Sequence, residues 1–195
     1  TRSGAPCPPG SSPDSPPMSE LALLAITLGD PAGTGPELLT KALILPEIRA
    51  LCRPLVVGDA AVLAKACAYT GSAARVRAFA SPEAAEFAEG EIAVHDLKNV
   101  DLTRLQLGRA DPMAGHAAYE YVKTAAELAL AGRVGGIVTS AINKAALNAA
   151  GHHFDGHTGL LADVCKAPGA TMMLVADKLR VSHVSTHVSL RQAID

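Results

Sequence analysis

The stretch LAITLGDPAGTGPELLTKAL, residues 24–43, joins an apolar run to a leucine-rich segment through a loop that is dense in glycine. The apolar run, residues 21–28, predicts a buried strand, and Glu37–Leu45 predicts a helix. Pro36 suits the first turn of such a helix, where no backbone N–H is needed. The stretch therefore predicts a strand–loop–helix unit, which is the building block of an α/β fold.

The loop inside this unit contains Gly29, Asp30, Gly33 and Gly35. Glycine permits positive φ angles and the close approach of a ligand, and the N-terminus of the helix that follows attracts anions. The spacing matches neither the dinucleotide fingerprint G-x-G-x-x-G nor the P-loop. Two interpretations therefore stay open: these four residues line a ligand cleft, or they form a tight connection that binds nothing.

The remainder of the chain repeats the alternation of strands and helices. Further strands are predicted at residues 54–57, 76–79, 92–94, 135–139, 171–175 and 180–184, and further helices at residues 60–69, 114–131, 144–150, 158–165 and around Leu190 and Ile194. Continuous apolar strands that alternate with amphipathic helices predict an α/β fold in which helices cover both faces of a sheet.

Composition excludes several classes of protein. The chain has 195 residues, of which 49% are hydrophobic and 18% charged, so it can bury a globular core. A net charge of -2 gives no basic footprint for nucleic acid, and no apolar run reaches the length of a membrane span. The four cysteines form no C-x-x-C pair, which favours a reducing cytoplasm over a disulfide framework. They are Cys7, Cys52, Cys67 and Cys165.

The first 17 residues, TRSGAPCPPGSSPDSPP, differ from the rest in composition. Proline, serine and glycine dominate, so this segment cannot bury enough apolar surface to offset its ordering entropy. It also lacks the basic start and apolar stretch of a signal peptide. We therefore expect residues 1–17 to be a disordered leader that precedes Met18.

Five of the seven histidines fall between residues 152 and 187, a clustering that suits metal or phosphate binding. They are His152, His153, His157, His183 and His187. His157 and Thr158 lie at the start of a predicted helix, where an imidazole and a hydroxyl can hold a phosphate or carboxylate. The alternative for Thr158 is a capping role. His187 follows a predicted strand, where an α/β sheet usually places its ligand groups.

Four stretches together resemble one family. ITLGDPAGTGPE, GIVTSAINKAALNAAGHHFDGHT, TMMLV and STHVSL, in this order, resemble the 4-hydroxythreonine-4-phosphate dehydrogenase family from Leu21 to the last residue. The resemblance implies an architecture similar to isocitrate and isopropylmalate dehydrogenases, with two α/β domains and a homodimer whose site lies at the dimer interface. It divides this chain into a first domain at residues 18–150 and the truncated start of a second at residues 151–195, whose C-terminal remainder is missing.

The resemblance also implies an activity. Members oxidise 4-phosphooxy-L-threonine with NAD or NADP and a divalent metal ion (Zn, Mg or Co), and the 3-oxo acid product decarboxylates to 3-amino-2-oxopropyl phosphate in pyridoxine 5'-phosphate synthesis. The family's substrate-binding pair carries over onto His157 and Thr158, and one metal ligand onto His187. His152, His153 and His183 match no ligand position of the family.

Three positions depart from the family pattern: Ala141 where proline is common, Gly159 where glutamate is common, and Ser185 where threonine is common. These departures leave the ligand groups intact, but they leave the identity of the substrate undecided. One alternative is a paralogue that acts on a phosphorylated four-carbon sugar acid or on a dihydrodiol. Another is a non-catalytic remnant, because a single histidine does not hold a metal ion that takes several ligands.

Overall fold

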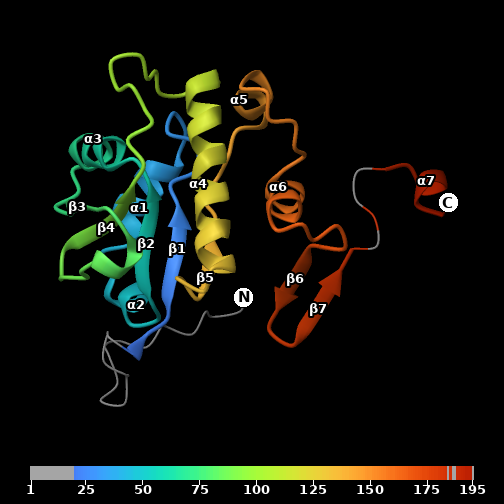
Figure 1. Cartoon of the computed structure of the whole chain (residues 1–195), viewed down its shortest axis with the longest axis horizontal. Helices are drawn as coiled ribbons and strands as arrows, with labels where there is room; N and C mark the ends of the chain where they lie inside the picture. The colour runs from blue at the N-terminus through green and yellow to red at the C-terminus, as the bar shows by residue number, and fades with distance from the viewer. Residues whose placement is uncertain (1–19, 184, 186–187, 195) are drawn as a thin grey trace, which may run out of the picture.

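The computed structural model describes residues 20–183, 185 and 188–194 and shows an open α/β sheet with helices on both faces (Figure 1). Five strands form the sheet in the order β3-β4-β2-β1-β5, and every neighbouring pair is parallel. They are β1 Leu23–Thr27, β2 Arg53–Gly58, β3 Arg75–Phe79, β4 Glu91–Asp96 and β5 Gly136–Val138. The predicted α/β fold is confirmed. The predicted leader and His187 lie outside the described residues.

Helices α1 (Gly35–Ala42) and α3 (Ala60–Thr70) pack against each other on one face of the sheet. Helix α4 (Pro112–Leu130) covers the other face, where it contacts β1, β2 and β5. From β1 the chain therefore builds the sheet in one direction through α1 and α3, and after α4 it returns to the other side of β1 with β5. The carboxyl ends of β1 and β5 flank the point where the strand order reverses, which is where open α/β sheets bind ligands.

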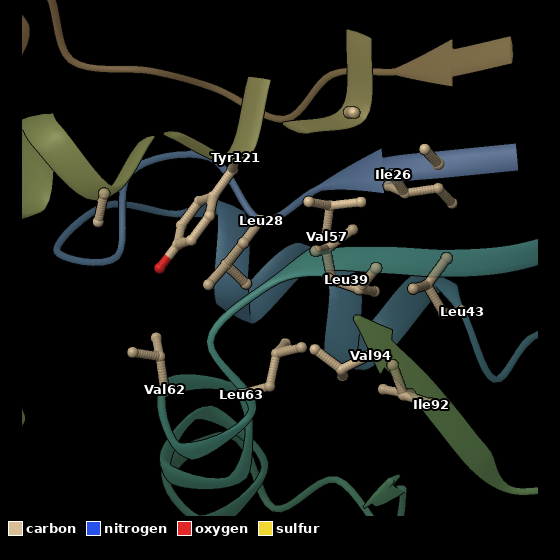
Figure 2. Packing of buried hydrophobic residues seen from close by; sticks show 14 of the residues in the cluster. Ile26, Leu28, Leu39, Leu43, Val57, Val62, Leu63, Ile92, Val94 and Tyr121 are labelled. Atoms are coloured by element: carbon tan, nitrogen blue, oxygen red, sulfur yellow. The ribbon is translucent and has the colours of Figure 1, made fainter. Parts of the chain in front are cut away.

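The core fills the space between the sheet and these helices (Figure 2). Its buried side chains include Ile26, Leu28, Leu39, Leu43, Val57, Val62, Leu63, Ile92, Val94 and Tyr121. Burial of such apolar surface is the dominant favourable term in folding. The Tyr121 hydroxyl is the exception among these groups, because it has no hydrogen-bond partner within the described part of the chain. Burial, together with the charges of Asp59, Asp96 and Asp30, raises the pKa of this hydroxyl.

Local sequence explains where α4 begins. The Asp111 side chain accepts hydrogen bonds from the backbone N–H groups of Met113 and Ala114, at 2.8 and 3.3 Å. Pro112 takes the first helical position, where its missing N–H costs nothing. The helix consequently starts two residues before the predicted 114–131. The other predicted helices and strands are also found, with ends that differ by a few residues.

Two short elements were not predicted: α2 (Pro46–Arg49) and the 3-10 turn η2 (Pro82–Ala84). Each begins with proline and is too short to show a helical period. A third difference concerns the last two strands, β6 (Met173–Ala176) and β7 (Leu179–Ser182). They do not join the five-stranded sheet but form a separate antiparallel hairpin.

The hairpin follows from its connection. Residues 177 and 178 alone join the paired Ala176 and Leu179, and a two-residue loop can connect only antiparallel strands. Asp177 has a φ of 52°, the left-handed conformation that such turns require. All residues of both strands are exposed within the described part of the chain. The hairpin lies beyond α5 (Lys144–Ala149) and α6 (His157–Val164), and the short α7 (Leu190–Ile194) follows it (Figure 1).

Candidate functional site

A pocket of about 610 Å³ opens at the start of α6 and contains both residues of the predicted substrate-binding pair. One wall is formed by residues 155–159, which include His157 and Thr158. The other wall comes from residues 170–172, just before β6, and from His183 and Ser185, just after β7. The pocket therefore joins the helix start to the base of the hairpin.

His157 occupies the first position of α6, so the helix begins one residue earlier than predicted. Gly156 precedes it with a φ of 154°, a conformation that residues with a side chain rarely adopt. The Nε2 atom of His157 is buried and has no hydrogen-bond partner within the described residues. Burial lowers the pKa of this imidazole, and the nearby backbone of Ser140 offsets part of the effect. The ring is therefore neutral near pH 7, with one nitrogen able to donate and the other to accept.

Thr158 is the second residue of α6 and lines the same pocket. The residue in the capping position is Gly156, and no side chain caps this helix end with a hydrogen bond. The capping role that the sequence left open for Thr158 is therefore not what the structure shows. The first N–H groups of a helix have no partner within the helix, so the N-terminus of α6 offers donors to an anion beside the Thr158 hydroxyl.

An aromatic stack fixes the segment that leads into α6. On α4, His116 and Tyr119 face His152 and Phe154 from the connection between α5 and α6. The Tyr119 and His152 ring centroids lie 3.8 Å apart, and His116 Nδ1 lies 2.9 Å from His152 Nε2. The second distance is a hydrogen bond, so at least one of the two imidazoles is neutral. Sequence analysis gave His116 and His152 no site role, and the structure shows that they anchor the approach to His157.

The glycine loop packs against the segment that follows β5. The Asp30 N–H donates to the Ala141 carbonyl at 2.9 Å, and the Ser140 N–H donates to the Thr27 hydroxyl at 3.1 Å. A Cβ atom on Gly29 would fall 2.5 Å from the Ala141 oxygen. These contacts explain the glycine by close backbone approach at the strand-order reversal.

Two further residues of the loop, Gly35 and Asp30, also lie in close contact with their surroundings. A Cβ atom on Gly35 would fall 2.2 Å from the Leu28 oxygen. The Asp30 carboxylate is buried, and its Oδ1 accepts the Ala32 N–H at 2.8 Å. Burial raises the pKa of this carboxyl, although the Ala32 hydrogen bond lowers it. Gly29, Asp30, Gly33 and Gly35 do not line the pocket at α6, so a role as cleft lining stays a prediction.

Metal ligands are incomplete in the described part of the chain. Within residues 20–183, 185 and 188–194, no three His, Cys, Asp or Glu side chains gather as a metal site would require. The predicted ligand His187 lies outside these residues. The described residues by themselves therefore do not fit a divalent ion, and such an ion would need ligands from elsewhere.

Two further histidines and the cysteines can be placed as well. His95 is partly buried at the end of β4, and burial lowers its pKa, whereas His153 is exposed. Cys52 and Cys67 are buried free thiols, and Cys165 is free as well. Burial raises the pKa of both buried thiols, so they are poor nucleophiles at neutral pH. None of the described helices is both long and apolar enough to cross a membrane.

An open parallel sheet, combined with a pocket of imidazole and hydroxyl groups at a helix N-terminus, is typical of α/β proteins that bind small anionic ligands. Comparison with known proteins specifies the class further. The chain belongs to the PdxA family, because the family model described as "Pyridoxal phosphate biosynthetic protein PdxA" matches residues 50–195.

Individual relatives carry two different names. A D-threonate 4-phosphate dehydrogenase of Cupriavidus necator is 43% identical over 174 residues, which cover 89% of this chain and 52% of the relative. A 4-hydroxythreonine-4-phosphate dehydrogenase of Trichlorobacter lovleyi is 40% identical over 168 residues, which cover 86% of this chain and 50% of the relative. The chain thus spans about half the length of the curated relatives it matches.

A solved structure agrees with the fold. The crystal structure of a 4-hydroxythreonine-4-phosphate dehydrogenase from Burkholderia phymatum matches with a TM-score of 0.83 and 41% identity. The match covers 89% of this chain and 52% of that one. The resemblance inferred from the four sequence stretches is therefore confirmed at the level of the family.

Proposed function

We propose that the whole protein is an NAD- or NADP-dependent dehydrogenase that oxidises a small phosphorylated hydroxy acid, and that the pocket at α6 binds this substrate. The observation that carries the proposal is the position of His157 and Thr158, side by side on one pocket wall at a helix N-terminus. Membership of the PdxA family supports it, and so do the names of the relatives.

Within this class two substrates compete. The first is 4-phosphooxy-L-threonine, oxidised to a 3-oxo acid that decarboxylates to 3-amino-2-oxopropyl phosphate. The second is D-threonate 4-phosphate, a phosphorylated four-carbon sugar acid, which the relative at 43% identity is named for. The two share a phosphate and a carboxylate and differ in an amino group or a hydroxyl beside the carboxylate. A pocket that holds their shared anionic groups accepts both classes.

The described residues have a binding and orienting role in this proposal. The Thr158 hydroxyl, the first N–H groups of α6 and the His157 imidazole would hold an anionic group of the substrate. Fixed at that end, the substrate would keep its reacting C–H bond in one direction, and orientation of this kind lowers the barrier of a transfer reaction. Bound NAD or NADP would supply the hydride acceptor. The stack of Tyr119 on His152 keeps the chain that enters α6 in place.

The larger architecture belongs to the same proposal. We infer that the whole protein has two α/β domains and forms a homodimer, with the site completed by residues beyond those described. A divalent ion, with His187 among its ligands, would need that completion because the described residues gather no three donors. We therefore expect the 195-residue chain alone to turn over no substrate. For the isolated chain, the alternative of a non-catalytic remnant is therefore retained.

The test uses the whole protein as its gene encodes it. Each of the two 4-phosphates is offered with NAD and with NADP, with and without Mg²⁺ or Zn²⁺, and reduction of the nicotinamide is followed by its absorbance. We expect reduction that needs the divalent ion and the substrate phosphate. The ratio of kcat/KM for the two acids then identifies the substrate. No reduction in any combination would contradict the proposed function.

A further inference from the structure

His183 lines the pocket that contains His157 and Thr158, although it matches no ligand position of the family. It follows directly after β7 and is far from His157 in the sequence. It therefore comes from the other wall of the pocket. Other histidines have different surroundings. His116 and His152 bond to each other, and His153 is exposed and does not line the pocket.

The backbone of His183 is fixed on both sides. The Thr171 hydroxyl donates a hydrogen bond to the His183 carbonyl at 2.9 Å, and the His183 N–H donates to the Met172 carbonyl at 3.4 Å. These bonds extend the β6–β7 pairing by one step and hold His183 at the edge of the pocket. They also occupy the Thr171 hydroxyl proton, so the other side-chain donors of the described lining on this wall are the His183 imidazole and the Ser185 hydroxyl.

The lining has a distinctive charge pattern. It contains no lysine or arginine among the described residues, and Asp155 is its one carboxylate. A phosphorylated acid that enters this pocket therefore meets imidazoles, hydroxyls and backbone N–H groups in place of full positive charges. The His183 imidazole can donate an N–H to an anionic oxygen from one wall, while the Thr158 hydroxyl and the first N–H groups of α6 donate from the other. These hydrogen bonds can offset the repulsion from Asp155.

We propose that His183 is a second substrate-binding histidine, which contacts an anionic oxygen of the substrate from the wall formed by the ends of the hairpin. This inference rests on the proposed function and extends it, because it makes the hairpin part of the substrate site. The walls of the site then come from two elements, α6 and the β6–β7 hairpin, and the spacing of the two histidines limits the length of the acid that fits.

The experiment follows the histidine ring signals of the whole protein by NMR. The protein is labelled with ¹³C-histidine, and signals are assigned with His157→Gln, His183→Gln and His153→Gln. The probes are inorganic phosphate and D-threonate 4-phosphate, added in separate titrations. We expect the His157 and His183 signals to move along one binding curve while the His153 signal stays. Loss of one hydrogen bond to a charged group corresponds to about ten- to hundredfold in affinity, which His183→Ala should show.

His183→Gln keeps donor N–H groups and should recover part of that loss, whereas His153→Gln should bind as the wild type does. If the His157 signal moves and the His183 signal does not, His183 is no substrate residue and the proposed function stands. If neither signal responds to either probe, the proposed function falls and this inference falls with it. A His183 signal that responds to Mg²⁺ or Zn²⁺ alone, and not to the phosphates, also overturns the inference and makes His183 a metal ligand.

Discussion

Gly35→Ala tests whether the loop needs its glycines because backbone segments pack closely there. A Cβ atom at position 35 would fall 2.2 Å from the backbone oxygen of Leu28. The Leu28 oxygen belongs to the backbone, so no side-chain rotation relieves this contact, and α1 must shift away from the end of β1. Overpacking of this kind costs about 1–3 kcal/mol, against a gain of at most ~1 kcal/mol from the better helix propensity of alanine.

Gly33→Ala is the matched control in the same loop. There the nearest atom to an added Cβ, the Cβ of Asp30, lies 3.3 Å away, and the φ angle is not positive. This contact is tight but needs a shift of only a few tenths of an ångström at Asp30, so we expect the variant to lose less than about 1 kcal/mol. Urea denaturation of both variants gives the free energies of unfolding, and in a protein of this size 1 kcal/mol also shifts Tm by about 2–4 °C. A fully stable Gly35→Ala variant with weakened ligand affinity would refute the packing explanation and favour a cleft-lining loop.

Three further predictions concern stability and use the same denaturation assay. Tyr121→Phe removes a buried hydroxyl that has no partner within the described residues, so we expect the protein to be unchanged or more stable; a loss above about 2 kcal/mol would show that the hydroxyl is satisfied. Burial lowers the pKa values of His95, His152 and His157 in the folded state. The unfolded chain therefore binds protons more readily than the folded protein. The free energy of unfolding should be highest above the unfolded pKa of about 6.5 and should decrease as the pH falls through the pKa values of the folded state. A flat profile over that pH range would contradict these assignments. Removal of residues 1–17 should leave Tm nearly unchanged, because their composition cannot support a packed structure; a fall of many degrees would show that they pack on the core.

The sequence predicts the sheet and its helices well because both depend on local patterns. The apolar run before Gly29 and the periodic apolar positions of α4 each indicate their element without knowledge of the rest of the chain. The hairpin was harder to predict. Its strands have the same apolar character as those of the sheet, and only the two-residue connection at 177–178 distinguishes them.

The candidate site is only partly visible in the sequence. His157 and Thr158 were found because a family motif contains them and because they lie at a helix start. The stack of His152 on Tyr119 and the position of His183 in the pocket depend on contacts between distant segments. No local spacing encodes such contacts, although the clustering of histidines after residue 151 was a signal that more than one of them lies near the site.

The central claim is that the pocket at the start of α6 binds the substrate, and Thr158→Val tests it most directly. Valine keeps the branched shape of threonine and removes only the hydroxyl, which caps no helix end here. Loss of a hydrogen bond to a charged group costs roughly 1.5–3 kcal/mol, so the dissociation constant for the 4-phosphate substrate of the whole protein should rise about ten- to hundredfold. The melting curve and the NAD affinity of the same variant should stay close to those of the wild type. Unchanged substrate affinity, with stability lowered by about 1 kcal/mol, is the signature of a lost cap and would contradict the assignment of this pocket.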